Sequence, residues 1–180
     1  MSGGVRPRGM ARTLALALGF ALLAAAPAAA DVLEVGDRAA ELDVATDARG
    51  KGFKLKAYRG SWLVVTVGAA WCKPCAKELP VWDKLAGELK GKVTFIAIDI
   101  DDSAADGKKF HKKLKLKNMT LAYMPADKSG VVASYGSDTM PTSFVIDGKG
   151  IVRVVKKGFE EGDTSGEYKK LKAELAKLVK

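Results

Sequence analysis

The chain has 180 residues, of which 48% are hydrophobic and 28% are charged, and its formal net charge is +9 at pH 7. This length suits one domain with a single hydrophobic core, and no internal repeat or low-complexity linker marks a second domain. Two cysteines and one histidine are too few for a four-ligand zinc site. The basic surplus has no basic–aromatic motif, so we expect no nucleic-acid partner, and we also expect no metal and no cofactor.

Residues 1–30 predict an export leader. Three arginines without any acidic residue precede the stretch 13–26, which is continuously apolar or small, and three alanines at 28–30 fit a cleavage site. A membrane-spanning helix needs about 20 strongly apolar residues, so we predict a cleaved signal peptide and a mature domain of residues 31–180. The alternative is a retained N-terminal anchor, which would associate the protein with the membrane.

Both forms place the domain in the periplasm or on the outer face of the cytoplasmic membrane. Cysteine pairs in such compartments form disulfides unless something reduces them. Whether the pair donates or accepts electrons there is therefore the central functional question.

Removal of the leader and its three arginines lowers the formal charge from +9 to +6.

The first predicted elements of the domain are β-strands. Segments 42–44 and 53–55 flank the turn sequence DARG at 47–50, which predicts an N-terminal β-hairpin. The apolar, β-branched segment 62–67 predicts a buried central strand. Helical spacing of apolar residues over 73–89 then predicts a helix with one buried face, which Gly91 would terminate.

Both cysteines lie where this strand gives way to the helix. Cys72 falls at the predicted helix N-terminus, where unpaired N–H groups and the helix dipole favour an anion, and Lys73 adds positive charge. Thiols in such positions have pKa values of roughly 3.5–7.5 instead of about 8.5. Cys75 follows about one turn later, so we predict that Cys72 attacks and Cys75 resolves. The alternative, a structural disulfide, would close a loop too short to add much chain-entropy stabilisation.

The second half of the domain alternates between strands and helices. Segment 93–98 predicts another buried strand, and Ser103 with Asp106 predicts a capping box for a helix that reaches about residue 114. This helix contains His111, which we expect to be exposed among its lysines. The lysines here and near the C-terminus predict solvated faces, with a docking surface for an acidic partner or an anionic membrane as the alternative.

Three further elements complete the domain. Residues 131–135 predict a short helix, and segments 143–146 and 151–155 flank DGKG at 147–150, a strong hairpin signal. Thr164 with Glu167 predicts the cap of a last helix that runs to about residue 179. The order of elements predicts an α/β sandwich, with a mixed sheet and helices on both faces.

Three short motifs carry a resemblance to a known family. The sequence WCKPC at 71–75 resembles the active site of the thioredoxin superfamily, ELP at 78–80 resembles its exported TlpA/ResA-like branch, and MPTSFVID at 140–147 is a further match. The resemblance covers roughly residues 35–179 and implies a thioredoxin-like three-layer sandwich, in which 120–136 is an insertion. It also implies that Pro141 is cis, packs against the cysteine pair, and binds substrate together with Trp71 and Met140.

Glu78 is a third candidate catalytic residue. A partly buried carboxylate three residues after Cys75 could take up its proton and disfavour a nearby thiolate, and by resemblance Glu78 matches a carboxylate that tunes the pair in TlpA/ResA-like proteins. Thr66 stands where thioredoxin has a buried aspartate, which leaves more of this role to Glu78. Gly68 and Ala69 replace aromatic residues, which allows a more open floor. The alternative is a surface glutamate paired with a lysine.

The resemblance implies an exported thiol–disulfide oxidoreductase, most consistent with a reductant of protein disulfides in cytochrome c maturation or copper-site assembly. We expect a monomer that acts on disulfide-bearing proteins and is re-reduced by a membrane thiol-electron donor. One alternative is a thiol oxidase, which Lys73 favours by stabilising the thiolate, although the large helical insert typical of DsbA-like oxidases is missing. Another is a metal-handling factor resembling Sco-type proteins, which use a wider cysteine spacing and a distal histidine.

Overall fold

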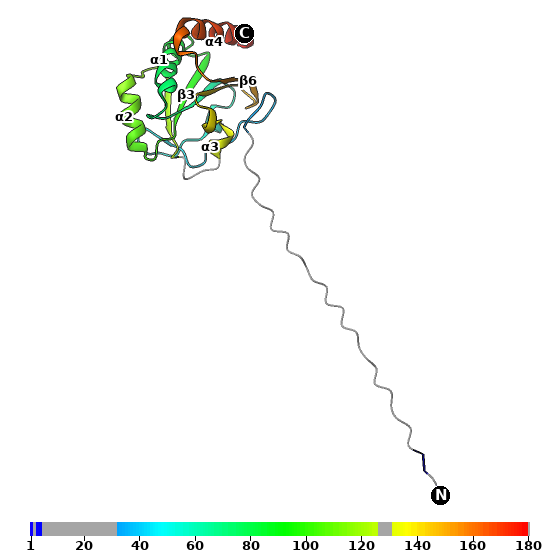
Figure 1. The fold of residues 1–180 in the computed structure, drawn as a ribbon. Coiled ribbons are helices and arrows are strands. Elements are labelled where there is room, and N and C mark those ends of the chain that lie inside the picture. The colour runs from blue at the N-terminus through cyan, green and yellow to red at the C-terminus, as the bar shows by residue number, and fades with distance from the viewer. Residues whose placement is uncertain (2, 5–31, 126–130, 180) are drawn as a thin grey trace.

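The computed structural model describes residues 1, 3–4, 32–125 and 131–179 (Figure 1). The predicted leader and its cleavage site therefore lie almost wholly outside the described residues. No helix within the described ranges is both long enough and apolar enough to cross a membrane.

The described residues contribute six strands to one mixed sheet, in the order β1-β4-β3-β2-β5-β6. The strands are β1 (Thr46–Asp47), β2 (Trp62–Gly68), β3 (Val93–Asp99), β4 (Thr120–Tyr123), β5 (Thr142–Ile146) and β6 (Val152–Lys157). Strands β2, β3 and β4 run parallel, whereas β1, β5 and β6 are antiparallel to their neighbours. Strand β2 is buried almost throughout, as its continuous β-branched sequence predicts.

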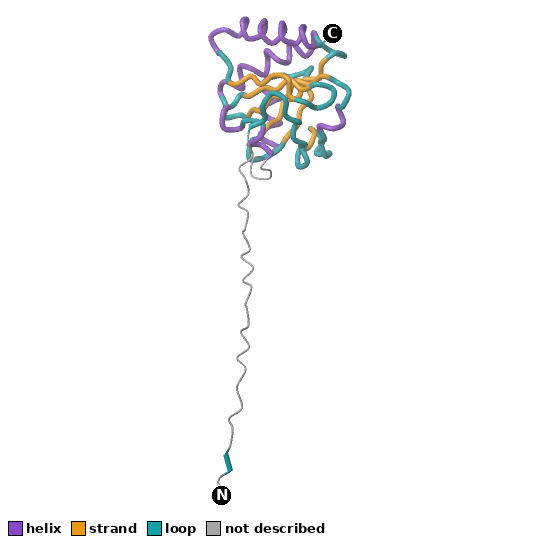
Figure 2. The backbone as a smooth tube through the Cα atoms, turned by 90° about the vertical axis from the view of Figure 1, so that its right-hand side faces the viewer, coloured by secondary structure: helices purple, strands orange, loops and turns teal. Residues whose placement is uncertain are grey.

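One face of the sheet is covered by helices. The α-helices of the described ranges are α1 (Lys73–Glu88), α2 (Ala104–Leu114), α3 (Val131–Ser134) and α4 (Thr164–Leu178), and α1, α2 and α4 lie on this face. Helices α1 and α2 join consecutive parallel strands, and right-handed crossovers place such helices on the same face. Leu171 and Leu175 of α4 share a core with Trp82 of α1 and Phe110 of α2. Figure 2 shows α4 above the strands on this side.

The opposite face is covered by the N-terminal segment and by the region of α3. Leu42, Phe53 and Tyr135 pack there with Val65 and Ile96 of the central strands. The second layer is thus mostly irregular chain with one short helix, and the three layers confirm the predicted thioredoxin-like sandwich.

The predicted N-terminal hairpin is present, but its arms are 45–47 and 51–53 instead of 42–44 and 53–55. Thr46 bridges Gly52 in antiparallel fashion, and the N–H of Phe53 donates to the carbonyl of Ala45 at 2.8 Å. Asp47 accepts hydrogen bonds from the N–H groups of Arg49 and Lys51 and so closes the turn at 2.8 and 2.9 Å. Residues 42–44 form no strand, and Leu55 begins a short 3-10 helix (Leu55–Tyr58). The reason is that the apolar side chains of these segments enter the core directly, while β1 pairs with β4.

Helix starts match the prediction in one case and differ in another. Ser103 accepts a hydrogen bond from the N–H of Asp106 at 3.2 Å, which confirms the predicted cap of α2. Helix α4 is capped by Asp163, whose carboxylate accepts from the N–H of Gly166 at 2.8 Å. Thr164 is therefore the first helical residue and not the cap, because the aspartate before it supplies the acceptor.

Two other predictions are corrected on the α2 side. Residues 120–123 form β4, so the predicted insertion begins with a strand of the sheet, and its residues 126–130 lie outside the described part. His111 is buried, with 2% of its surface exposed, and its Nδ1 lies 3.3 Å from the hydroxyl of Tyr123. Burial lowers the pKa of His111 to about 4, so the ring is neutral at pH 7.

Candidate active site

Cys72 and Cys75 form a disulfide at the start of α1. The two Cα atoms lie 5.3 Å apart, as the one-turn spacing predicts. Cys72 is the N-cap residue of α1, and its sulfur accepts the N–H of Cys75 at 3.2 Å. Cys72 keeps 6% of its surface exposed, whereas Cys75 is fully buried. Solvent and a partner can therefore reach only the first sulfur.

Strand β2 passes directly beneath the second cysteine. A Cβ atom at Gly68 would lie 3.2 Å from the Cβ of Cys75 and 3.6 Å from its sulfur. Cys75 thus occupies the space that a side chain at position 68 would need. The expectation of a more open floor under the active site is wrong, because Cys75 and Leu79 of α1 pack directly against Gly68.

Glu78 is completely buried one turn after Cys75, with 0% of its surface exposed. The hydroxyl of Thr66 on β2 donates to its Oε2 at 2.7 Å, and the hydroxyl of Ser143 on β5 donates to its Oε1 at 3.1 Å. The indole N–H of Trp82 donates in turn to Ser143 at 3.1 Å. The expected alternative of a surface glutamate paired with a lysine is therefore wrong.

The same surroundings set the proton affinity of Glu78. Burial raises the pKa of Glu78 to about 7, against the opposing effects of the Thr66 hydrogen bond and the positive charge of Lys156. A carboxyl group with this pKa can gain or lose a proton at neutral pH. Sequence reasoning missed Ser143 and Trp82 as members of this network, although Ser143 belongs to the MPTS motif.

An open groove lies beside Cys72 on the surface of the molecule. It has a volume of about 380 Å³ and is lined by Trp71, Cys72, Lys73, Pro74, Asp138 and Met140. Trp71 is 65% exposed, and the Met140–Pro141 peptide bond is cis, as the resemblance implies. The carbonyl of Pro141 accepts the N–H of Gly158 at 2.8 Å, which ties this loop to the end of β6. The structure thus brings Trp71 and Met140 to the same groove as Cys72.

Two aspartates at the end of β3 support the turn before the cysteines. The N–H of Ala70 lies 3.1 and 3.0 Å from the two carboxylate oxygens of Asp101. Asp99 lies below it with 1% exposed surface, accepts the N–H of Asp101 at 3.2 Å, and abuts Gly107 of α2. Burial, and then the charge of Asp101, raise the pKa of Asp99 to about 8. No sequence motif indicated this contact.

The site contains no obvious place for a metal ion. Within the described ranges, no three or more side chains of histidine, cysteine, aspartate or glutamate gather in a way that could hold one.

Sequence comparisons relate this chain to known thiol–disulfide oxidoreductases. The AhpC/TSA family profile matches residues 35–155. The thiol-disulfide oxidoreductase ResA of Bacillus cereus (strain ATCC 10987 / NRS 248) is 35% identical over 156 residues, which cover 86% of this chain and 87% of the relative.

Solved structures of similar fold include other thiol–disulfide exchange proteins. A structure assigned as the thiol:disulfide interchange protein DsbE from Chlorobium tepidum has a TM-score of 0.67 and 27% identity, covering 78% of this chain and 97% of that one. The exposed lipoprotein thioredoxin Etrx1 from Streptococcus pneumoniae strain TIGR4 has a TM-score of 0.57 and 26% identity, covering 73% of this chain and 99% of that one.

Proposed function

The chain belongs to the AhpC/TSA family of thioredoxin-like proteins and is a thiol–disulfide oxidoreductase, and on this premise we propose that it is an exported reductant of protein disulfides. The observation that carries the proposal is the wholly buried Glu78, one turn after Cys75 in the same helix. A carboxylate in that place opposes a second negative charge on the cysteine pair. It therefore favours the disulfide form of the pair and the donation of its electrons.

The reaction begins with the reduced pair. The Cys72 thiolate attacks one sulfur of the substrate disulfide, a Cys72–substrate bond forms, the substrate S–S bond breaks, and the other substrate sulfur leaves as a thiolate. The N–H of Cys75 and the start of α1 stabilise the attacking thiolate. The partial exposure of Cys72 makes this residue the attacking one.

The second step releases the substrate. The Cys75 thiol gives its proton to the Glu78 carboxylate, and the resulting thiolate attacks the Cys72 sulfur. The Cys72–Cys75 disulfide forms, the mixed disulfide breaks, and the second substrate sulfur leaves as a thiolate. Two electrons have then passed to the substrate, and the thiolates take protons from Glu78 and from water.

The groove beside Cys72 is the proposed substrate site. An extended substrate chain would lie against Trp71 and Met140, and Pro141 would present the Met140 backbone to it, as the family resemblance implies. Substrates of this kind are disulfide-bearing proteins, of which apocytochrome c and copper-site proteins are the classes that the family resemblance implies. A membrane thiol-electron donor would restore the reduced pair of a monomeric protein.

Two observations support export of the protein. The leader sequence favours export, and one structural relative is described as an exposed lipoprotein thioredoxin. Such a compartment supplies disulfides that need reduction, because thiols there are oxidised unless a dedicated system reduces them.

A thiol oxidase is the second candidate, and one contact favours it. The hydrogen bond from the Cys75 N–H to the Cys72 sulfur stabilises a thiolate, and a stabilised reduced form makes a pair more oxidising. The reduction potential against glutathione decides between the two. We expect a value near the roughly −270 mV of thioredoxin, whereas a value above about −160 mV, towards the roughly −120 mV of DsbA, would overturn the reductant assignment.

A further inference from the structure

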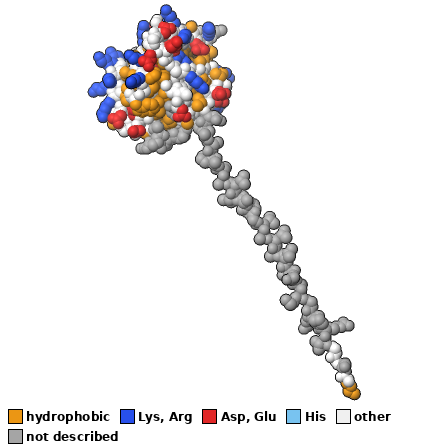
Figure 3. Space-filling model, viewed as in Figure 1, with side chains coloured by type: hydrophobic (Ala, Val, Ile, Leu, Met, Phe, Trp, Pro, Cys, Tyr) orange, Lys and Arg blue, Asp and Glu red, His pale blue; other side chains and the backbone are white. Residues whose placement is uncertain are grey.

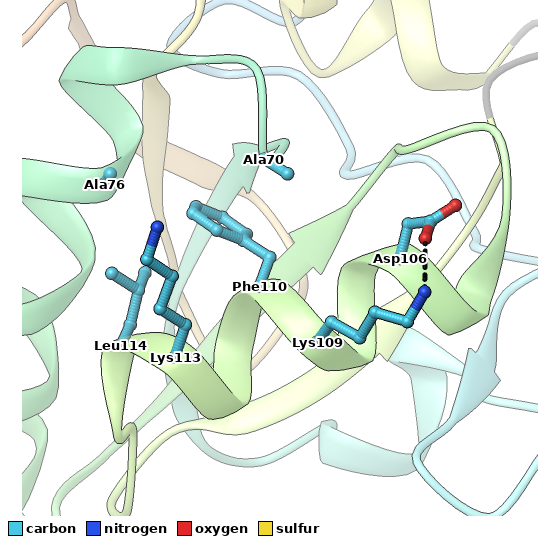
Figure 4. A pocket seen from close by; sticks show the side chains of 7 residues that line it. All are labelled: Ala70, Ala76, Asp106, Lys109, Phe110, Lys113 and Leu114. Carbon is cyan, nitrogen blue, oxygen red and sulfur yellow. Dashed lines mark hydrogen bonds and ion pairs between the residues drawn. The ribbon is translucent and has the colours of Figure 1, made fainter.

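A second hollow, separate from the groove, lies between α1 and α2 (Figure 4). Its volume is about 430 Å³, within the range of roughly 300–1,000 Å³ that is usual for ligand pockets. Ala70, two residues before Cys72, and Ala76, one residue after Cys75, form the side nearest the disulfide. The active-site turn therefore separates the hollow from the substrate groove.

The hollow has a firm apolar wall. Figure 4 shows the ring of Phe110 extending from α2 into the space between Ala70 and Ala76, with Leu114 one turn further along the helix. Phe110 is only 6% exposed and belongs to the core beneath α1, against which Ala76 and Leu114 also pack. A pocket whose wall is part of the core is already formed, so an apolar group can enter it without first ordering the protein.

The rim of the hollow is basic. Lys109, Lys113 and Asp106 line it, and Asp106 is paired with Lys109 at 3.1 Å, which leaves a net positive charge. Lys113 forms no ion pair with any carboxylate of the described residues. Lys and Arg side chains gather over α2 beside a hydrophobic patch in Figure 3. The complementary ligand is therefore apolar at its tip and acidic next to it.

The hollow lies within reach of a chain that reacts at Cys72. Ala70 and Cys72 are two residues apart, so their Cα atoms are separated by about 7 Å at most. A substrate whose cysteine lies at Cys72 can thus place a side chain two or three residues away into the hollow.

We propose that this hollow is a docking pocket for the substrate protein. An extended segment of the substrate inserts a large apolar side chain between Phe110 and Ala76 and sets a neighbouring aspartate or glutamate against Lys113. The pocket selects substrates by residues beside the reacting cysteine, while the groove at Trp71 and Met140 holds the cysteine itself. This inference rests on the proposed function, because it assumes that protein disulfides are the substrates.

Two disulfide-bearing peptides test the pocket. One carries Phe-Glu-Glu starting three residues before its first cysteine, and the other carries Ser-Gln-Gln at the same positions. The measurement is kcat/KM for reduction of each peptide by the reduced full-length protein. The same peptides in dithiol form measure the reverse reaction, so the docking pocket is tested whichever way electrons flow.

We expect the Phe-Glu-Glu peptide to react about tenfold faster than its partner, because a filled apolar pocket and one charge pair both contribute. Lys113→Glu should reduce this preference about threefold and remove its dependence on salt. Lys112→Glu is the matched control, because it makes the same charge change on the same helix outside the hollow, and it should keep the full preference.

Ala76→Leu provides a test that does not depend on charge. Leucine is a good helix former and would fill the hollow from α1. The preference should disappear while the Ser-Gln-Gln peptide still reacts, which shows that the protein is folded and its cysteine pair intact.

Two results overturn the docking pocket and leave the proposed function standing. One is equal reaction of both peptides with the unaltered protein. The other is an identical preference in Lys113→Glu and Lys112→Glu. Failure of every variant and of the unaltered protein to exchange with any disulfide would overturn the proposed function, and the docking pocket with it.

Discussion

Glu78 and Asp99 are both buried carboxyl groups near the active-site turn, but their neighbours differ. Both oxygens of Glu78 accept hydrogen bonds from neutral hydroxyl groups, at 2.7 and 3.1 Å. Asp99 accepts one N–H, from Asp101, and its Oδ2 has no partner among the described residues. Burial raises the pKa of both, to about 7 for Glu78 and to about 8 for Asp99, where the charge of Asp101 adds to the effect.

The difference supports the proton-carrying role that we propose for Glu78 and a structural role for Asp99. The hydroxyls of Thr66 and Ser143 can rotate to donate or accept, so Glu78 can hold either charge state without losing its hydrogen bonds. Asp99 lies beside a second carboxylate, and taking up a proton removes the repulsion between them. Asp101 is then free to hold the N–H of Ala70, the residue that leads into the active-site turn.

The largest expected effect tests the role of resolving thiol that we propose for Cys75. Cys75→Ser should abolish turnover and accumulate a mixed disulfide between Cys72 and the substrate, because the resolving thiol is gone. Cys72→Ser should accumulate none. Mass spectrometry of the trapped species measures both, and equal trapping by the two variants would contradict the assignment of attacking and resolving thiols.

Glu78→Gln tests the proton carrier. Loss of a positioned proton acceptor should slow resolution of the mixed disulfide about 100-fold and remove the change in rate near pH 7. Stopped-flow decay of the mixed disulfide between pH 5 and pH 9 measures this. Asp99→Asn is the control, because it removes another buried carboxyl group and keeps Glu78. Its dependence of rate on pH should match that of the unaltered protein. An unchanged profile in Glu78→Gln would exclude Glu78 as the acceptor.

Asp101→Ala tests the structural support. The N–H of Ala70 would lose its acceptor, so the free energy of unfolding should fall by about 1–3 kcal/mol. Urea denaturation measures the loss. Asp102→Ala removes the neighbouring exposed carboxylate and should change stability by less than about 0.5 kcal/mol. Equal losses in the two variants would show that the Ala70 contact contributes nothing.

The smallest expected effect belongs to Asp99→Asn at pH 5, because asparagine resembles the protonated carboxyl group. The folded pKa of about 8 exceeds the unfolded value of about 3.9, so between about pH 4 and pH 8 only the folded state keeps this proton. Stability due to this group therefore falls as pH rises through that window and is constant above it. Urea denaturation across the window should show a shallower fall in Asp99→Asn, and parallel curves would refute the assignment.

Much of the fold could be predicted because its signals are local. Capping by Ser103 involves a residue three positions away, and the turn at Asp47 involves residues two and four positions away. Such contacts form within one turn of chain and can be inferred from residue type and spacing. The arms of the N-terminal hairpin were predicted too far from its turn, because Leu42 and Leu55 pack into the core and the pairing is confined to residues next to the turn.

The burial of His111 could not be predicted for a related reason. Lysines on both sides of it indicate a solvated helix, and nothing nearby in the chain reveals that this side chain faces Tyr123 on β4. Propensity and charge describe a helix surface only on average, whereas burial of one side chain depends on which strand the helix crosses.

By itself the sequence determined where the cysteine pair lies, one turn apart at the start of a helix. Spacing, the helix start and Lys73 all act within one turn, so they hold wherever the helix is placed. Only the tertiary structure decided the rest of the site. Glu78 meets Ser143 across 65 residues and Ala70 meets Asp101 across 31, and the hollow exists only where α1 and α2 lie side by side. Burial and proton affinity depend on packing between such distant segments, which no local pattern specifies.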